Sequence, residues 1–187
     1  SRGLGDVYKR QIQDIHDEQG EIALCILSAV NVGGLNDLSE LENICDLSVR
    51  ALEQIIDYQD YPVRAAEVST KKRRSLGVGY IGLAHYLAKN GVKYSDPKAW
   101  ELVDRLSEAF QYHLLRASCN IAIEKGKCEG FDRTKYADGL LPIDHYKKEV
   151  DEIVPHKQRM AWESLRKDIA KYGLRHSTLS AQMPSES

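Results

Sequence analysis

The segment from Glu21 to Val32 limits the possible folds more than any other part of the chain. It contains an almost continuous apolar run, Ile22-Ala23-Leu24-Cys25-Ile26-Leu27, and it stops at Gly33-Gly34. Short runs of this kind, bounded by glycines, are typical of strands buried on both faces of a parallel sheet. A buried helix segment is the alternative, but the length and the Ile and Val content favour a strand. We therefore expect an α/β protein with a strand over Ile22 to Val32.

Apolar residues at helical spacing predict three amphipathic helices. The first runs from Leu38 to about Tyr58 behind a capping box that begins at Asp37, and Cys45 lies on its apolar stripe. The other two run from Pro97 to Gly126 and from Met160 to Tyr172. Shorter helices are expected before Asn90-Gly91 and near His145 to Val150.

Composition and charge exclude several classes of protein. The 187 residues carry a net charge of -2, are 42% hydrophobic and contain no apolar run of membrane-spanning length, so neither nucleic acid nor a membrane is expected as a partner. The four cysteines form no CxxC pair, and the six histidines show no metal-ligand spacing, so no metal site is expected. We expect a soluble cytoplasmic protein whose cysteines are buried unless their context says otherwise.

The glycines Gly77, Gly79 and Gly82 match the GxGxxG pattern of dinucleotide-binding proteins. That pattern requires a hydrophobic strand directly before its first glycine, whereas the basic run Lys71 to Arg74 precedes Ser75 and Leu76 here. We expect these glycines to allow close packing of a helix against backbone instead. The basic run is most simply a solvated turn, with phosphate contact as the alternative.

The C-terminal residues suggest an anion site. The segment Ser177 to Met183 has the composition of a strand, and Pro184, Ser185, Glu186 and Ser187 follow it. A proline suits the first turn of a helix, where free N–H groups and serine hydroxyls can bind phosphate oxygens. A frayed polar terminus is the alternative. At the other end, Ser1 to Gln11 shows no periodicity and resembles translated adapter sequence, so residues 12–187 are taken as the domain.

Several motifs in order resemble the large catalytic (alpha) subunit of class I ribonucleotide reductase, bacterial type. The similarity begins after residue 12, and its most specific stretch lies near the C-terminus. The matching residues are Gly20 to Cys25, Leu27-Ser28-Ala29, Asn31, Ala51-Leu52, Asp57 to Pro62, Arg73 to Gly79, Tyr94-Ser95-Asp96, Leu141 to Asp144, Trp162, Leu165, Gly173 to His176, Ser180-Ala181 and Pro184.

The resemblance implies a helix-rich segment of a ten-stranded α/β barrel that encloses the active site. It implies reduction of ribonucleoside diphosphates to 2'-deoxyribonucleoside diphosphates, with Cys25 as one member of a redox-active cysteine pair. Leu27 would line the substrate pocket. Pro184, Ser185 and Ser187 would hold the substrate diphosphate, and Glu186 would orient that loop or the ribose side.

The resemblance also implies partners outside this chain. A metal-containing small (beta) subunit would supply the radical, and thioredoxin or glutaredoxin would restore the thiols. ATP and deoxynucleotide effectors would bind regions that this sequence lacks, and the full-length subunit would form a homodimer. The radical-bearing cysteine, a catalytic carboxylate and the second redox cysteine are also absent, so we expect no activity from this polypeptide alone.

Two other hypotheses remain at this point. A nicotinamide-binding oxidoreductase would depend on Gly77 to Gly82 and should bind NAD(P)H saturably. A non-enzymatic helical interaction module would keep Cys25 as a core residue and should melt cooperatively, whereas an excised barrel segment should melt poorly and expose apolar surface.

Overall fold

A computed structural model describes residues 20–153 and 157–182 of the chain. The main elements are β1 (Ile26–Asn31), α2 (Glu40–Tyr58), α3 (Arg64–Arg73), β2 (Leu76–Ile81), α4 (Leu83–Lys89), α5 (Pro97–Lys125) and α6 (Trp162–Tyr172). Short 3-10 turns occur at η1 (Val32–Gly34), η2 (Phe131–Arg133), η3 (Pro142–Asp144) and η4 (Lys148–Glu152).

The two strands form a parallel pair, in which Ile26 lies opposite Leu76 and Asn31 lies opposite Ile81. Parallel strands need a long crossover, and here α2 and α3 provide it. α2 packs against both strands, so the first half of the chain is a βαβ unit. This arrangement confirms the expected α/β class.

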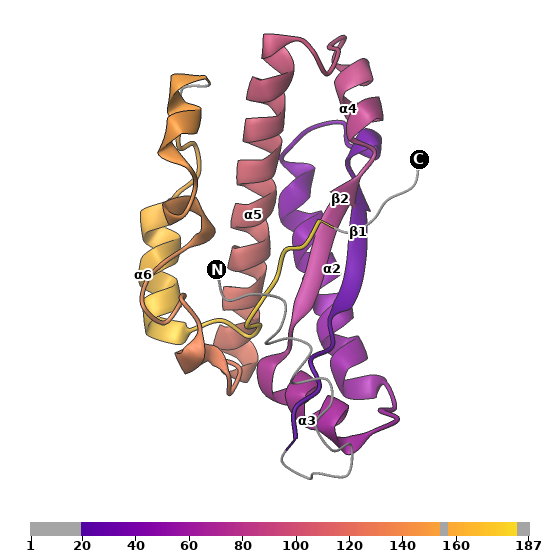
Figure 1. Ribbon diagram of the computed structural model, residues 1–187, viewed down its shortest axis with the longest axis vertical. Coiled ribbons are helices and arrows are strands. Elements are labelled where there is room, and N and C mark those ends of the chain that lie inside the picture. Colours follow the sequence, from indigo (N-terminus) through magenta and orange to yellow (C-terminus); the bar gives the residue numbers. More distant parts are fainter. Residues whose placement is uncertain (1–19, 154–156, 183–187) are drawn as a thin grey trace.

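The core lies where α2, α5 and the strands meet. α2 sits behind the strands, and α5 lies between them and α6 (Figure 1). Cys45 is completely buried on the α2 face that packs against α5, which confirms that it is a core residue. The predicted bounds of the longest helix also hold, because α5 begins at Pro97 and its C-cap is Gly126. The helices α2 and α6 each begin two residues later than predicted, at Glu40 and Trp162. Among the described residues, no helix combines the length and apolar character needed to cross a membrane.

The first strand differs from the prediction in length and in burial. β1 covers only Ile26–Asn31, and Cys25 lies just before it. Of its residues only Val30 is buried, and the side chain of Leu27 is 53% exposed. The expected burial on both faces is therefore absent here, because among the described residues β2 is the only strand beside β1 and no second layer covers its outer face.

The predicted strand from Ser177 to Met183 is not a regular strand over its described part, which ends at Gln182. A single parallel bridge joins Ser180 to Val78. The N–H groups of Leu76 and Val78 donate to the carbonyls of Thr178 and Leu179, at 3.0 and 2.8 Å. These two donors are two residues apart in β2, but their acceptors are adjacent in the C-terminal segment. In a regular parallel ladder the acceptors would also be two residues apart. The segment lies along β2, but its ladder is interrupted.

Sequence periodicity missed α3, whose apolar face consists mainly of small residues such as Ala65 and Ala66. The run Lys71 to Arg74, interpreted as a solvated turn, forms the end of this helix, and Arg74 is only 4% exposed. Between His145 and Val150 the expected helix is instead the 3-10 turn η4, which begins at Lys148.

Candidate functional site

The thiol of Cys25 lies at the entrance to β1 and is exposed, whereas Cys45, Cys119 and Cys128 are buried. Partial burial raises the pKa of Cys25 above its ordinary value. Burial raises the pKa of Cys45 to about 12 and that of Cys119 to about 11. Because the thiolate is the reactive form, Cys25 is the cysteine that this fold leaves available for redox chemistry.

Three side chains from two separate parts of the chain converge on Gly77 in β2. A Cβ atom placed there would lie 2.5 Å from Cδ2 of Leu27, 2.9 Å from Sγ of Cys25 and 3.1 Å from Cβ of Ala181. Cys25 and Leu27 therefore share a face, as the two-residue spacing predicts. Ala181 brings the C-terminal segment to the same place.

The other predicted site residues follow this segment. Pro184, Ser185, Glu186 and Ser187 lie outside the described residues, so their role stays a prediction. The last described residue, Gln182, donates from its side-chain amide to the backbone carbonyl of Tyr80 at 3.3 Å.

Chemical modification should separate Cys25 from the other cysteines. We expect iodoacetamide to alkylate Cys25 well before Cys45, Cys119 or Cys128, at a rate that increases as the pH rises toward the raised pKa of Cys25. Peptide mass spectrometry of briefly treated native protein measures the order. Equal labelling of all four cysteines would contradict this description of the site.

Gly77→Ala should disturb the site directly. The added methyl group would overlap Leu27, Cys25 and Ala181, and overpacking of this kind costs about 1–3 kcal/mol. We expect a lower urea midpoint and slower alkylation of Cys25. Gly34→Ala is the matched control, because nothing lies within 4 Å of the position that its Cβ would occupy. If both variants behave alike, the close approach at Gly77 has no consequence.

A cluster of buried charged side chains forms around Glu53 of α2. The carboxylate of Glu53, 1% exposed, accepts hydrogen bonds from Arg74 Nε at 2.7 Å, Arg175 Nε at 2.8 Å and His176 Nε2 at 3.0 Å. Burial by itself would raise the pKa of Glu53, but hydrogen bonds from His176, Arg74 and Arg175 outweigh it and hold the pKa at about 2. Burial lowers the pKa of His176, so its ring is neutral at neutral pH.

No local pattern predicts this cluster, although the sequence contains one signal of it. Glu53 falls on the apolar stripe of α2, four residues after Val49 and three before Ile56. A carboxylate on a buried helix face requires a charged partner. Which residues supply that partner depends on the tertiary structure.

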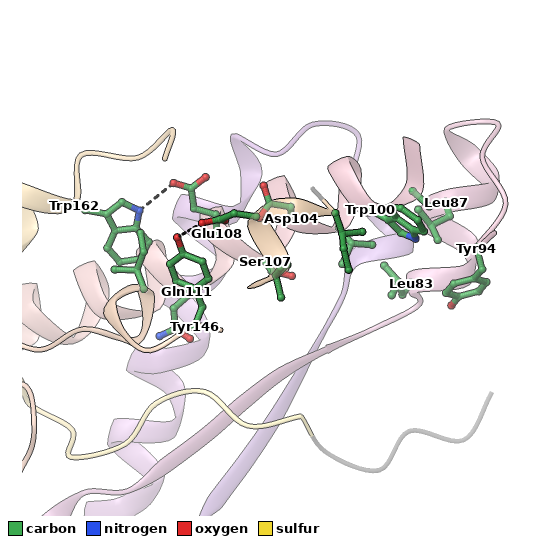
Figure 2. Close-up of a pocket in the computed structure, with 16 residues that line it drawn as sticks. Leu83, Leu87, Tyr94, Trp100, Asp104, Ser107, Glu108, Gln111, Tyr146 and Trp162 are labelled. Atoms are coloured by element: carbon green, nitrogen blue, oxygen red, sulfur yellow. Dashed lines mark hydrogen bonds between the residues drawn. The ribbon is translucent and has the colours of Figure 1, made fainter. Parts of the chain in front are cut away.

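A hollow of about 760 Å³ lies along α4 and α5 and is lined mostly by apolar side chains (Figure 2). Both tryptophans of the chain, Trp100 and Trp162, line it. Trp162 Nε1 donates to the carboxylate of Glu108 at 3.0 Å, which Figure 2 shows as a dashed line. None of the residues that the sequence analysis assigned to the site lies in this hollow, and it contains no cysteine.

The glycine pattern does not form a dinucleotide site. Gly77 and Gly79 lie inside β2, whereas the fingerprint needs its glycines in the turn that follows the strand. Only Gly82 occupies that turn, with a φ of 77°. The expected close packing of a helix at these glycines is also wrong for Gly77, because β1 and the C-terminal segment approach it. Among the described residues, no group of three or more His, Cys, Asp or Glu side chains could hold a metal ion.

Comparisons with known proteins give a consistent result. A family model described as "Ribonucleotide reductase, barrel domain" matches residues 11–187. The ribonucleoside-diphosphate reductase alpha subunits of Haemophilus influenzae and Buchnera aphidicola are 57% and 56% identical over 177 residues, which is 95% of this chain. Subunit alpha of ribonucleoside-diphosphate reductase 1 from Escherichia coli is 52% identical over 131 residues, 70% of this chain and 17% of that subunit. The chain spans 23% of the length of the first two relatives.

Proposed function

Because this chain belongs to the ribonucleotide reductase barrel-domain family, we propose that it supplies one redox thiol and part of the substrate site of a ribonucleoside-diphosphate reductase. Its helix-rich α/β structure is a segment of that barrel domain. The relatives carry the name of this enzyme, and the proposal extends their activity to the longer protein that contains this sequence.

In the proposed reaction, the bond between C2' of the ribose and its hydroxyl oxygen breaks and a C–H bond forms in its place. The oxygen leaves as water. Two thiols supply the two electrons and two protons and become one disulfide, so that atoms and electrons balance. Cys25 is proposed to be one of these thiols, and the second lies outside this sequence.

The observation that supports this assignment best is the position of Cys25. Cys25 is exposed, and its thiol meets Leu27 and Ala181 around Gly77, where even a methyl group would overlap them. We propose that Leu27 contacts the nucleotide there. Pro184, Ser185 and Ser187 are proposed to hold the diphosphate, and Glu186 to orient that loop.

Other parts of the proposal concern partners. A metal-containing small subunit would generate the radical that starts the reaction, and thioredoxin or glutaredoxin would reduce the disulfide. ATP or deoxynucleotide effectors would regulate the full-length subunit, which would form a homodimer in the cytoplasm.

The full-length subunit that carries this sequence should make 2'-deoxyribonucleoside diphosphate when it is mixed with the small subunit, thioredoxin and a ribonucleoside diphosphate. Chromatography of the nucleotides measures the product. Omission of the small subunit should stop the reaction, and the 187-residue chain alone should make no product. A full-length subunit that forms no deoxynucleotide with all components present would contradict the proposed function.

A further inference from the structure

The buried cluster around Glu53 joins four parts of the chain that are distant in sequence. Glu53 comes from α2, Arg74 follows α3, Ser118 belongs to α5, and Arg175 and His176 begin the C-terminal segment. Ser118 Oγ lies 2.9 Å from Nδ1 of His176 and also accepts the backbone N–H of His176 at 3.2 Å. The backbone N–H of Arg175 donates to the carbonyl of Ser118 at 3.3 Å.

These contacts define one tautomer of His176 and one position for it. Glu53 can only accept, so Nε2–H of His176 donates to the carboxylate and Nδ1 accepts the hydroxyl proton of Ser118. Both ring nitrogens are then satisfied at zero exposure. A slide of one residue would take Arg175 and His176 away from Glu53, which would keep only the side chain of Arg74 as a hydrogen-bond donor, and would leave the imidazole buried without partners. Both changes cost more than repacking apolar side chains.

The same cluster holds the turn that leads into β2. Arg74 has a φ of 48° and is the one non-glycine residue of the described part with a positive φ. This left-handed conformation is unfavourable for a residue with a Cβ. The Arg74 guanidinium donates to Glu53 and to both carboxylate oxygens of Asp57, at 3.0 and 2.8 Å, and these bonds stabilise the turn.

The segment that follows His176 depends on this anchor because its own ladder to β2 is irregular. Ser177 N donates to the carbonyl of Arg73 at 3.0 Å, and Ala181 N donates to that of Val78 at 3.2 Å. The interrupted spacing between these bonds does not specify one register by itself. The register is specified instead by the hydrogen bonds that hold Arg175 and His176 in the cluster.

We propose that Glu53, Arg74, Arg175, Ser118 and His176 act together as a positioning cluster. The cluster fixes the register of residues 177–182 on β2, and thereby the placement of the substrate-binding part of the chain relative to the Cys25 thiol. This inference depends on the proposed function, because the residues after Gln182 are the ones proposed to hold the substrate diphosphate. His176 is the central positioning residue, since it bonds to both α2 and α5.

The test uses His176→Leu and His176→Gln in the full-length subunit. Leucine removes both ring nitrogens, whereas glutamine keeps an N–H donor near the place of Nε2. We expect His176→Leu to raise KM for the ribonucleoside diphosphate and to lower kcat/KM about 10- to 100-fold, the scale expected when reacting groups are misplaced by about 1 Å. His176→Gln should recover most of that loss.

A second readout does not need activity. Ala181 lies beside Cys25 at Gly77, so a shifted segment should change access to the thiol. We expect iodoacetamide to alkylate the Cys25 peptide several-fold faster in His176→Leu than in the parent. Ser118→Ala, which removes one hydroxyl, should show the same changes to a smaller degree and replaces His176→Leu if that variant does not fold.

Glu108→Gln is the matched control. Glu108 is also a buried carboxylate, which accepts from Arg159 N at 2.7 Å and from Trp162 Nε1 at 3.0 Å, but the cluster does not include it. The Glu108→Gln variant should be less stable than the parent but should have the same KM for the ribonucleoside diphosphate. If His176→Leu also keeps the parent KM and the parent Cys25 alkylation rate, the cluster is structural and the inference is wrong. If the parent subunit makes no deoxynucleotide while His176→Leu still exposes Cys25, the proposed function fails and the positioning role stands.

Discussion

Cys25→Ser in the full-length subunit should reduce multiple turnover with thioredoxin to the background of the assay. A serine hydroxyl has nearly the size of the thiol but cannot form a disulfide, so the two electrons that the reaction needs have no source. Substrate binding should remain, because serine adds no bulk beside Gly77 and Leu27. Product is measured as deoxyribonucleoside diphosphate per subunit over many reduction cycles.

Cys119→Ala provides the control for this prediction. Cys119 is fully buried in α5, and burial raises its pKa to about 11, so we expect this variant to keep multiple turnover. Sustained turnover by Cys25→Ser would remove the role that we propose for Cys25. Loss of turnover in both variants would indicate a general effect of cysteine replacement.

Glu53→Ala should have the largest effect on stability. Removal of the carboxylate leaves Arg74, only 4% exposed, without its closest ion-pair partner, and breaking a buried pair in this way costs about 3–5 kcal/mol. Hydrogen exchange should detect the change at the amide of Ser177, which donates to the carbonyl of Arg73. Its exchange should accelerate by about two to four orders of magnitude, since each factor of ten corresponds to about 1.4 kcal/mol.

Glu124→Ala is the control for the loss of a carboxylate. Glu124 accepts two hydrogen bonds from Arg50 at the surface, where solvent screens the pair, so little change is expected. If Glu53→Ala exchanges no faster than Glu124→Ala at Ser177, the buried cluster does not hold the segment.

Acid should weaken the same cluster. The folded pKa of Glu53 is about 2, below its ordinary value of 4.5, so its stabilising contribution is complete above about pH 4.5 and is lost as the pH falls toward 2. The pKa of His176 is also lowered from 6.5, so protonation of this residue favours the unfolded state as the pH falls below that value. The parent should therefore lose stability in acid more steeply than Glu53→Ala, as measured by urea midpoints across this range.

Much of the fold could be predicted from local patterns. Proline at position 97 and glycine at 126 bound α5, and the apolar stripe that contains Cys45 predicts the packing face of α2. Such signals act between residues three or four positions apart, so no tertiary information is needed to interpret them. The ordered motifs from Gly20 to Ala181 were sufficient to indicate the family, which the family model confirms.

The candidate site was only partly predictable. The common face of Cys25 and Leu27 follows from strand alternation, and the structure confirms it at Gly77. The apolar run from Ile22 to Leu27 predicts burial on both faces of a strand, but a strand is buried by its neighbours, and Val30 alone is buried in β1.

Local patterns in the sequence bound α5 and identify the apolar faces of α2, α5 and α6, but they place Cys25 inside a longer strand and give no sign of α3. The residues that satisfy the carboxylate of Glu53 follow from the folded arrangement alone. Arg74 is 21 positions away and His176 is 123 positions away. The physical reason is that a buried charge can be satisfied by any donor that the fold brings within about 3 Å, and no local pattern encodes which donor that is.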